Sequence, residues 1–203
     1  DLAYLRPIPN MVIGAPMTAE DLQDMMTLAK DYDGPIAIRY PRGRTNEGDE
    51  AIRRLGNEAK VTIGKGVCLR ESNDAKVAVL SIGAIGNTVM EAIDLVQELR
   101  SSEVQKQIAH YDMRWLKPID ESILAEVVEK YHTIITVEDG VISGGLGSAV
   151  AEFISDHSTR KTQNASIPRL IRLGVNDQFV EHGSTKELYH LLKLDKEGIC
   201  ESL

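Results

Sequence analysis

The sequence predicts an α/β protein: a largely parallel sheet with helices on both faces, preceded by the β-α-β tail of a second α/β domain. Strand and helix patterns alternate four times between Val77 and Leu192, which is the order of a parallel sheet with helical crossovers. A shorter β-α-β pattern comes first, and a polar stretch from Arg44 to Lys60 separates the two. We read that stretch as a linker.

The first pattern begins with a short apolar strand at Met11–Ala15. Thr18 and Asp21 then form a capping arrangement for a helix. Apolar residues follow at helical spacing, at Leu22, Met25, Met26 and Ala29. Asp33-Gly34-Pro35 ends the helix, and Ile36–Tyr40 alternates as a half-buried strand does. About 45 residues are too few for an independent core, so we expect this unit to be the last part of a larger domain.

Arg42 is the main candidate for a binding residue. The strand runs into Tyr40-Pro41-Arg42-Gly43, where Pro41 removes a backbone donor and Gly43 permits a turn. Arg42 is therefore expected just beyond the carboxyl end of a strand, where open α/β sheets bind ligands. Its guanidinium suits a phosphate or a carboxylate, and a surface ion pair is the alternative. Arg39 is expected to face the other way as an ion-pair partner, and Arg44 is expected to be solvated.

The second pattern supplies the elements of the parallel sheet. Val77–Ile82 is a dense apolar run typical of a strand buried on both faces, and Ser184 with Glu187 makes a capping box for the last helix. The predicted strands are Val61–Leu69 (a strand or hairpin), Val77–Ile82, Ile108–Asp112, Thr133–Val137 and Leu170–Leu173. The predicted helices follow Gly83–Asn87, Pro118–Asp120, Gly144–Gly147 and Ser184.

Composition excludes several classes of function. The net charge is −8 and the isoelectric point is near 5.2, which argues against general affinity for nucleic acid or acidic lipid. No apolar stretch approaches the roughly 18 residues that span a bilayer, and we find no signal peptide. We therefore expect a cytoplasmic protein. Cys68 and Cys200 lie far apart in the sequence, and we expect both to be reduced thiols.

The remaining candidate site residues allow both a functional and a structural interpretation, or a structural one alone. Gly144–Gly147 follows a strand and opens a helix, so its backbone donors could cradle an anion, but tight packing of the helix on the sheet is favoured. His182 could face a cleft or belong to a loop beside a helix cap. Trp115 is expected in interdomain or dimer packing. The other histidines show no spacing for a metal or a nucleophile; they are His110, His132, His157 and His190.

Five stretches together resemble the carboxyl-terminal third of the 1-deoxy-D-xylulose-5-phosphate synthases, thiamine-diphosphate enzymes of the transketolase superfamily. They are DLAYLRPIPNMVIGAP, DGPIAIRYPRG, DMRWLKPID, VEDGVISGGLGSAV and LGVNDQFVEHGS, in that order along the chain. The resemblance implies a transketolase C-terminal-domain-like fold. It assigns residues 1–44 to the end of the pyrimidine-binding (second) domain, 45–60 to a linker, and 61–203 to the C-terminal domain.

The resemblance also implies an activity. The full-length enzyme would be a transferase that condenses pyruvate with D-glyceraldehyde 3-phosphate, giving 1-deoxy-D-xylulose 5-phosphate and carbon dioxide for isoprenoid and thiamine biosynthesis. It would be a homodimer that uses thiamine diphosphate and Mg²⁺. By this match Arg42 holds the substrate phosphate, while Asp1 and Tyr4 follow the family's active-site histidine. Catalytic, cofactor and metal residues would lie outside this chain, so this segment alone is expected to be inactive.

One apparent metal motif, Glu138-Asp139-Gly140 with Asn164, lacks the family's first glycine, and we interpret it as structural.

Three alternative functions stay open at this point. The enzyme could be another transketolase-like protein or a 2-oxoacid dehydrogenase β subunit. The chain could also be a non-catalytic assembly module of flavodoxin-like architecture, because a fold does not determine a function.

Overall fold

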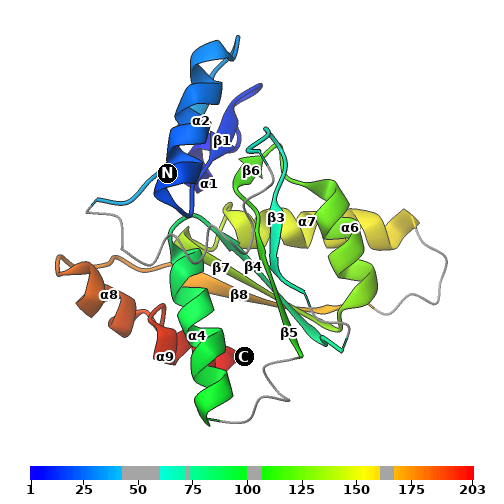
Figure 1. Ribbon diagram of the computed structural model, residues 1–203, viewed down its shortest axis with the longest axis vertical. Coiled ribbons are helices and arrows are strands. Elements are labelled where there is room, and N and C mark those ends of the chain that lie inside the picture. Colours follow the sequence, from blue (N-terminus) through cyan, green and yellow to red (C-terminus); the bar gives the residue numbers. More distant parts are fainter. Residues whose placement is uncertain (43–59, 72–73, 100–106, 161–166) are drawn as a thin grey trace.

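The computed structural model describes residues 1–42, 60–71, 74–99, 107–160 and 167–203, which form two sheets with helices around them (Figure 1). The larger sheet has the order β3 (Val67–Arg70), β5 (Ile108–Asp112), β4 (Val77–Ile82), β7 (Thr133–Val141) and β8 (Arg169–Val175). The smaller sheet has the order β2 (Ile36–Ile38), β1 (Val12–Gly14) and β6 (Trp115–Lys117). The helices are α1 (Leu2–Leu5), α2 (Ala19–Asp31), α4 (Ile85–Leu99), α6 (Glu121–Lys130), α7 (Leu146–Arg160), α8 (Thr185–Leu191) and α9 (Lys196–Ser202).

The larger sheet confirms the predicted fold class. Its strands β5, β4, β7 and β8 are parallel, and only β3 is antiparallel to its neighbour. Apolar residues of α6 and α7 share one core cluster with one face of the sheet, and those of α4 and α9 share a second cluster with the other face. Figure 1 shows these helices on opposite sides of the sheet. None of the helices in the described ranges is long and apolar enough to cross a membrane.

The predicted elements agree with the structure except at some ends. The capping box of Thr18 and Asp21 is present, and so is that of Ser184 and Glu187. The strand predicted at Ile36–Tyr40 ends at Ile38, and Tyr40 is exposed, so its predicted burial is wrong. The strand predicted from Val61 begins at Val67. The predicted linker falls outside the described residues, apart from Lys60.

Three short elements have no counterpart in the predictions. They are α1, β6 and α9, which contain four, three and seven residues. Such lengths are too short for hydrophobic periodicity to identify them. Of the three, β6 matters most for the architecture, because it comes from the C-terminal part of the chain and completes the sheet of the N-terminal part.

The two sheets are joined at β6. Strand β1 pairs with β2 in parallel on one side and with β6 antiparallel on the other. Trp115 of β6 is fully buried in a small apolar cluster with Val12 and Met25 of the N-terminal unit. Gly14 faces the Trp115 ring so closely that an added Cβ would lie 2.8 Å from it. The short N-terminal unit thus takes a large part of its core from the C-terminal unit. That it is also the last part of a larger domain stays a prediction.

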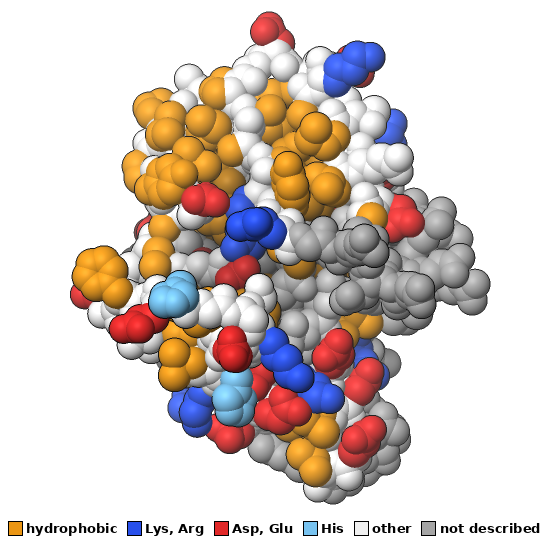
Figure 2. All heavy atoms as spheres, turned by 90° about the vertical axis from the view of Figure 1, so that its left-hand side faces the viewer, with side chains coloured by type: hydrophobic (Ala, Val, Ile, Leu, Met, Phe, Trp, Pro, Cys, Tyr) orange, Lys and Arg blue, Asp and Glu red, His pale blue; other side chains and the backbone are white. Residues whose placement is uncertain are grey.

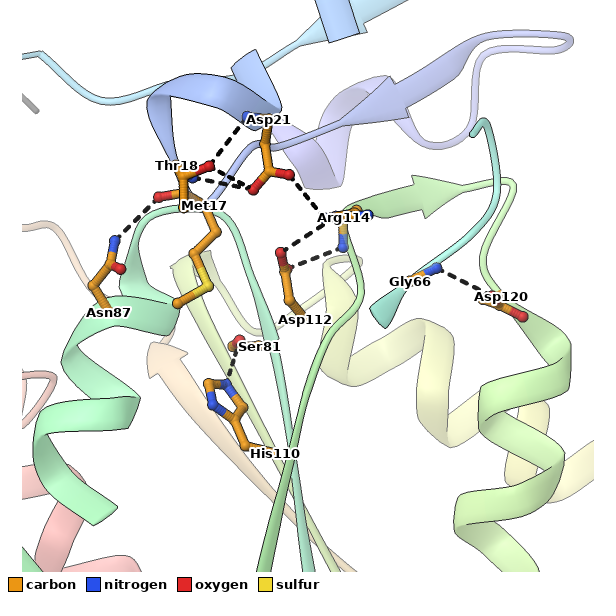
Figure 3. A network of polar contacts seen from close by, with 10 residues as sticks. All are labelled: Met17, Thr18, Asp21, Gly66, Ser81, Asn87, His110, Asp112, Arg114 and Asp120. Carbon is orange, nitrogen blue, oxygen red and sulfur yellow. Dashed lines mark hydrogen bonds and ion pairs between the residues drawn. The ribbon is translucent and has the colours of Figure 1, made fainter. Parts of the chain in front are cut away.

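A buried polar network crosses the same joint (Figure 3). The guanidinium of Arg114, one residue before β6, lies 2.9 Å from Asp21 of α2 and 4.0 Å from Asp112 of β5. The backbone N–H of Arg114 also donates to the Asp112 carboxylate, at 3.1 Å. All three side chains are nearly inaccessible to solvent. One guanidinium therefore faces two buried carboxyl groups, and it can balance the charge of only one.

This imbalance shows in the protonation of Asp112. Burial, and next the negative charge of Asp21, raise the pKa of Asp112 from 3.8 to about 7, against the opposing effect of Arg114. On the same strand, burial lowers the pKa of His110 from 6.5 to about 3. In the folded protein at pH 5 to 6, therefore, Asp112 carries a proton and His110 does not.

We predict that Asp112→Asn removes a pH-dependent loss of stability. Folded Asp112 keeps its proton to a higher pH than the unfolded chain does, so its contribution to stability decreases as the pH rises from about 4 to about 7. The amide keeps an acceptor for the Arg114 N–H but cannot ionise. The free energy of unfolding, followed by the fluorescence of the chain's single tryptophan, should rise in the variant relative to the wild type across this range.

The free energies of unfolding of the variant and the wild type must be subtracted at each pH, because His110 changes the stability in the opposite direction. Its lowered pKa makes the folded state lose stability as the pH falls below 6.5. His110 is present in both proteins, so its effect cancels when wild type and Asp112→Asn are subtracted. A difference that stays constant from pH 4 to pH 8 would show that Asp112 is ionised throughout this range in the folded protein.

Candidate functional site

Arg42 is exposed, four residues beyond the end of β2. Tyr40 and Pro41, which precede it, are exposed as well. Arg42 makes no hydrogen bond or ion pair with another residue of the described ranges, so the surface ion pair considered as an alternative is not found there. Arg44, expected to be solvated, lies outside the described residues.

Asp1 and Tyr4 lie on a different segment, the short helix α1. Asp1 is exposed and does not cap α1 with its side chain, and Tyr4 is 67% exposed. Helix α1 packs against β7, and Ala3 lies beside Gly144 in the loop that follows β7. Helix α1 therefore lies near the C-terminal end of β7, the strand with which Arg39 also forms a contact.

Arg39 makes the ion pair that the sequence led us to expect, and its partner is Asp139 of β7. The Arg39 Nη2 donates to the backbone oxygen and to the carboxylate of Asp139, each at 2.8 Å. Both side chains are about three-quarters buried. The pair links the last part of the N-terminal unit to the larger sheet, three residues before Arg42.

The glycine loop before α7 already holds an anion, and that anion is part of the protein. The two oxygens of Glu138 accept hydrogen bonds from the backbone N–H groups of Leu146 and Gly147, each at 2.9 Å. An added Cβ at Gly145 would lie 1.8 Å from Glu138, and one at Gly147 would lie 2.7 Å from Arg172 of β8. The glycines thus permit close packing of α7 on the sheet, in line with the favoured reading, and their donors are taken.

The buried position of Glu138 has an electrostatic consequence. Burial is the largest effect and raises the pKa of Glu138, although hydrogen bonds from Gly147 and Leu146 favour the ionised form. The positive end of the helix dipole adds to that support. Glu138 therefore acts as the cap of α7, and we assign it no contact with a substrate.

The structure contains a serine–histidine pair that we did not predict from the sequence. Ser81 Oγ lies 2.8 Å from His110 Nε2, and both residues are fully buried (Figure 3). An added Cβ at Gly86 would lie 2.7 Å from Met17 and 2.8 Å from Ser81 Oγ, so helix α4 closes over the pair. No signal in the sequence indicated it, because the two residues belong to neighbouring strands and are 29 positions apart. Without access for a substrate, the pair is structural.

Within the described residues, no group of three or more His, Cys, Asp or Glu side chains is placed to hold a metal ion. In the apparent metal motif, Glu138 caps α7 and Asp139 pairs with Arg39, while Asn164 lies outside the described residues. His182 is exposed on the loop before α8.

A hollow of about 380 Å³ lies between α1, β6 and the start of α7. Its two basic side chains are both engaged: Arg6 pairs with Glu152, and Lys117 donates to the backbone oxygens of Arg6 and Ile8 at 2.9 and 2.7 Å. Elsewhere on the N-terminal unit, Figure 2 shows apolar side chains gathered over one face. The unit's exposed large apolar residues are Tyr4, Ile8, Met26 and Tyr40.

The structure thus consists of a larger α/β unit and a short N-terminal unit joined to it at β6, with an exposed arginine beyond the end of β2. The family model described as "Transketolase, C-terminal domain" matches residues 64–199. The chain belongs to this family. A solved structure described as a split gene transketolase, inactive beta4 tetramer, is similar over 99% of this chain and 59% of its own, with a TM-score of 0.76 and 26% identity.

The curated relatives narrow the resemblance. Over its whole length, the chain is 51% identical to the 1-deoxy-D-xylulose-5-phosphate synthase of Parabacteroides distasonis, and the match covers 29% of that enzyme. Again over its whole length, it is 44% identical to the enzyme of the same name from Phocaeicola vulgatus, and the match covers 30% of that enzyme. The chain therefore spans about three-tenths of the length of these relatives.

We predict that Glu138→Ala destabilises the domain by about 2–4 kcal/mol, because two buried N–H groups of α7 lose their acceptor. Glu138→Gln is the matched control: it keeps the side-chain volume and one acceptor oxygen, and should cost about half as much. Urea denaturation of the three proteins gives the comparison. Equal stability of wild type and Glu138→Ala would mean that the carboxylate contributes nothing as a cap.

Proposed function

We propose that this chain is the C-terminal part of a 1-deoxy-D-xylulose-5-phosphate synthase, a thiamine-diphosphate-dependent transferase. The full-length protein would condense pyruvate with D-glyceraldehyde 3-phosphate, releasing carbon dioxide, and its product would serve isoprenoid and thiamine biosynthesis. The observation that carries the proposal is the 51% identity to a synthase over the whole chain. Solved transketolases of lower identity support the fold alone.

The cofactor and Mg²⁺ would be held by parts of the protein beyond this chain, because the described residues offer them no fit. We place the enzyme in the cytoplasm and expect it to act as a homodimer. A solved structure that is similar to this chain is described as a split gene transketolase, inactive beta4 tetramer. That description of an inactive assembly supports our proposal that this segment does not act alone.

We also propose that residues 1–44 are the end of the pyrimidine-binding domain, 45–60 the linker, and 61–203 the C-terminal domain. Three features support the first boundary. The smaller sheet has only three described strands, one of them contributed by β6. Its apolar cluster needs Trp115, and the unit exposes large apolar side chains. These features suit a fragment that continues into further strands.

Within this enzyme, Arg42 would bind the phosphate of glyceraldehyde 3-phosphate. It is exposed, unpaired within the described residues and placed after a strand end, where a guanidinium can meet an anionic substrate. A planar fork of donors suits phosphate oxygens. Asp1 and Tyr4, exposed on α1 beside β7, are candidates for lesser contacts with the same substrate.

We predict that Arg42→Ala in the full-length enzyme raises the KM for glyceraldehyde 3-phosphate about 10- to 100-fold and leaves the KM for pyruvate unchanged. The range follows from a charge-assisted contact of roughly 1.5–3 kcal/mol. Arg42→Lys keeps the charge but loses the fork, and should fall between the two. Steady-state kinetics with each substrate varied in turn gives the answer. An unchanged KM for the aldehyde would remove Arg42 from the site.

We predict that the 203-residue chain alone shows no synthase activity, with or without thiamine diphosphate and Mg²⁺, whereas the full-length protein is active only with both. Formation of 1-deoxy-D-xylulose 5-phosphate is the measurement. Turnover by the isolated chain would contradict the proposed division of labour. Activity of the full-length protein with other sugar phosphates, and none with pyruvate, would favour a transketolase.

A further inference from the structure

Within the described residues, the segment that leads to Arg42 is last held at Arg39. The Arg39 N–H donates to the backbone oxygen of Gly14 at 2.9 Å, and this is the last hydrogen bond that ties the segment to the smaller sheet within the described residues. The side chain of Arg39 holds Asp139 through two further hydrogen bonds. Tyr40, Pro41 and Arg42 are exposed, so packing does not hold them.

Asp139 is held in turn from a third direction. Tyr189 of α8 is partly buried beside it. Burial, followed by the nearby charge of Asp139, raises the pKa of Tyr189. Asp139 itself lies near the C-terminal end of β7, the strand between β4 and β8 in the larger sheet. The carboxylate therefore joins the end of β2 to the larger sheet, beside α8.

We propose that Asp139, acting through Arg39, is a positioning residue that sets where Arg42 presents its guanidinium to the substrate phosphate. This inference rests on the proposed function of Arg42. Three residues of extended chain span about 10 Å at most, so a shift of Arg39 changes the positions that the Arg42 guanidinium can reach. Misplacement of a binding group by about 1 Å is enough to weaken a substrate contact measurably.

The test is Asp139→Asn in the full-length enzyme. The amide keeps the size of the side chain and one acceptor oxygen, but the charged partner of Arg39 is lost. We expect the KM for glyceraldehyde 3-phosphate to rise about 3- to 10-fold, with kcat and the KM for pyruvate within about twofold of wild type. The KM for unphosphorylated D-glyceraldehyde should not change, because that aldehyde has no phosphate for Arg42 to hold.

Glu152→Gln is the matched control. The Arg6–Glu152 ion pair also joins the N-terminal unit to the C-terminal unit, from α7, but it does not hold the segment that leads to Arg42. It should leave every KM at the wild-type value, whereas Asp139→Glu should recover most of the affinity lost in Asp139→Asn. An equal rise in Glu152→Gln would show that general docking is affected, and would overturn the positioning role.

A double variant decides whether Asp139 acts through Arg42. If it does, Asp139→Asn causes no further rise in KM when Arg42 is already alanine; a second, multiplicative rise would refute the inference. Should Asp139→Asn fail to fold, Arg39→Lys replaces it with the same expectation. If Arg42→Ala alone has no effect, the proposed function of Arg42 fails. If Arg42→Ala raises the KM and Asp139→Asn does not, only the positioning role fails.

Discussion

The structure depends on one joint, at which a strand from the C-terminal part of the chain completes the sheet of the N-terminal part. Strand β6 pairs with β1, and its Trp115 fills the core of a unit too small to supply its own. Arg114, directly before this strand, reaches Asp21 of α2 across the boundary. Backbone pairing, apolar burial and a buried ion pair thus act at the same place, and they fix one unit on the other.

Fixing the N-terminal unit has a consequence for the candidate site. The end of β2 is brought to the rim of the larger sheet, where Arg39 meets Asp139. The preceding residue, Glu138, accepts hydrogen bonds from two buried N–H groups in the first turn of α7. Two adjacent carboxylates therefore have different roles: Glu138 caps helix α7, and Asp139 binds Arg39 in the segment before Arg42. We therefore propose the Arg42 side chain, rather than the helix terminus, as the anion site for a ligand.

The sequence predicted the larger sheet well because its strands are long apolar runs and its helices carry periodic faces and caps. Strand β4 has the predicted bounds, and both capping boxes form. The joint could not be predicted, since β6 is three residues long and pairs with a strand a hundred positions away. Arg39 was expected in an ion pair, but only the fold identifies its partner. The Ser81–His110 pair was missed for the same reason.

The most direct measurement is an experimental structure of the full-length protein with glyceraldehyde 3-phosphate bound. Our account predicts that the phosphate lies on the Arg42 guanidinium, with Arg39 still paired to Asp139 and Trp115 still buried between β1 and α2. A phosphate bound elsewhere, with Arg42 directed into solvent, would contradict the account while leaving the fold and its joint intact.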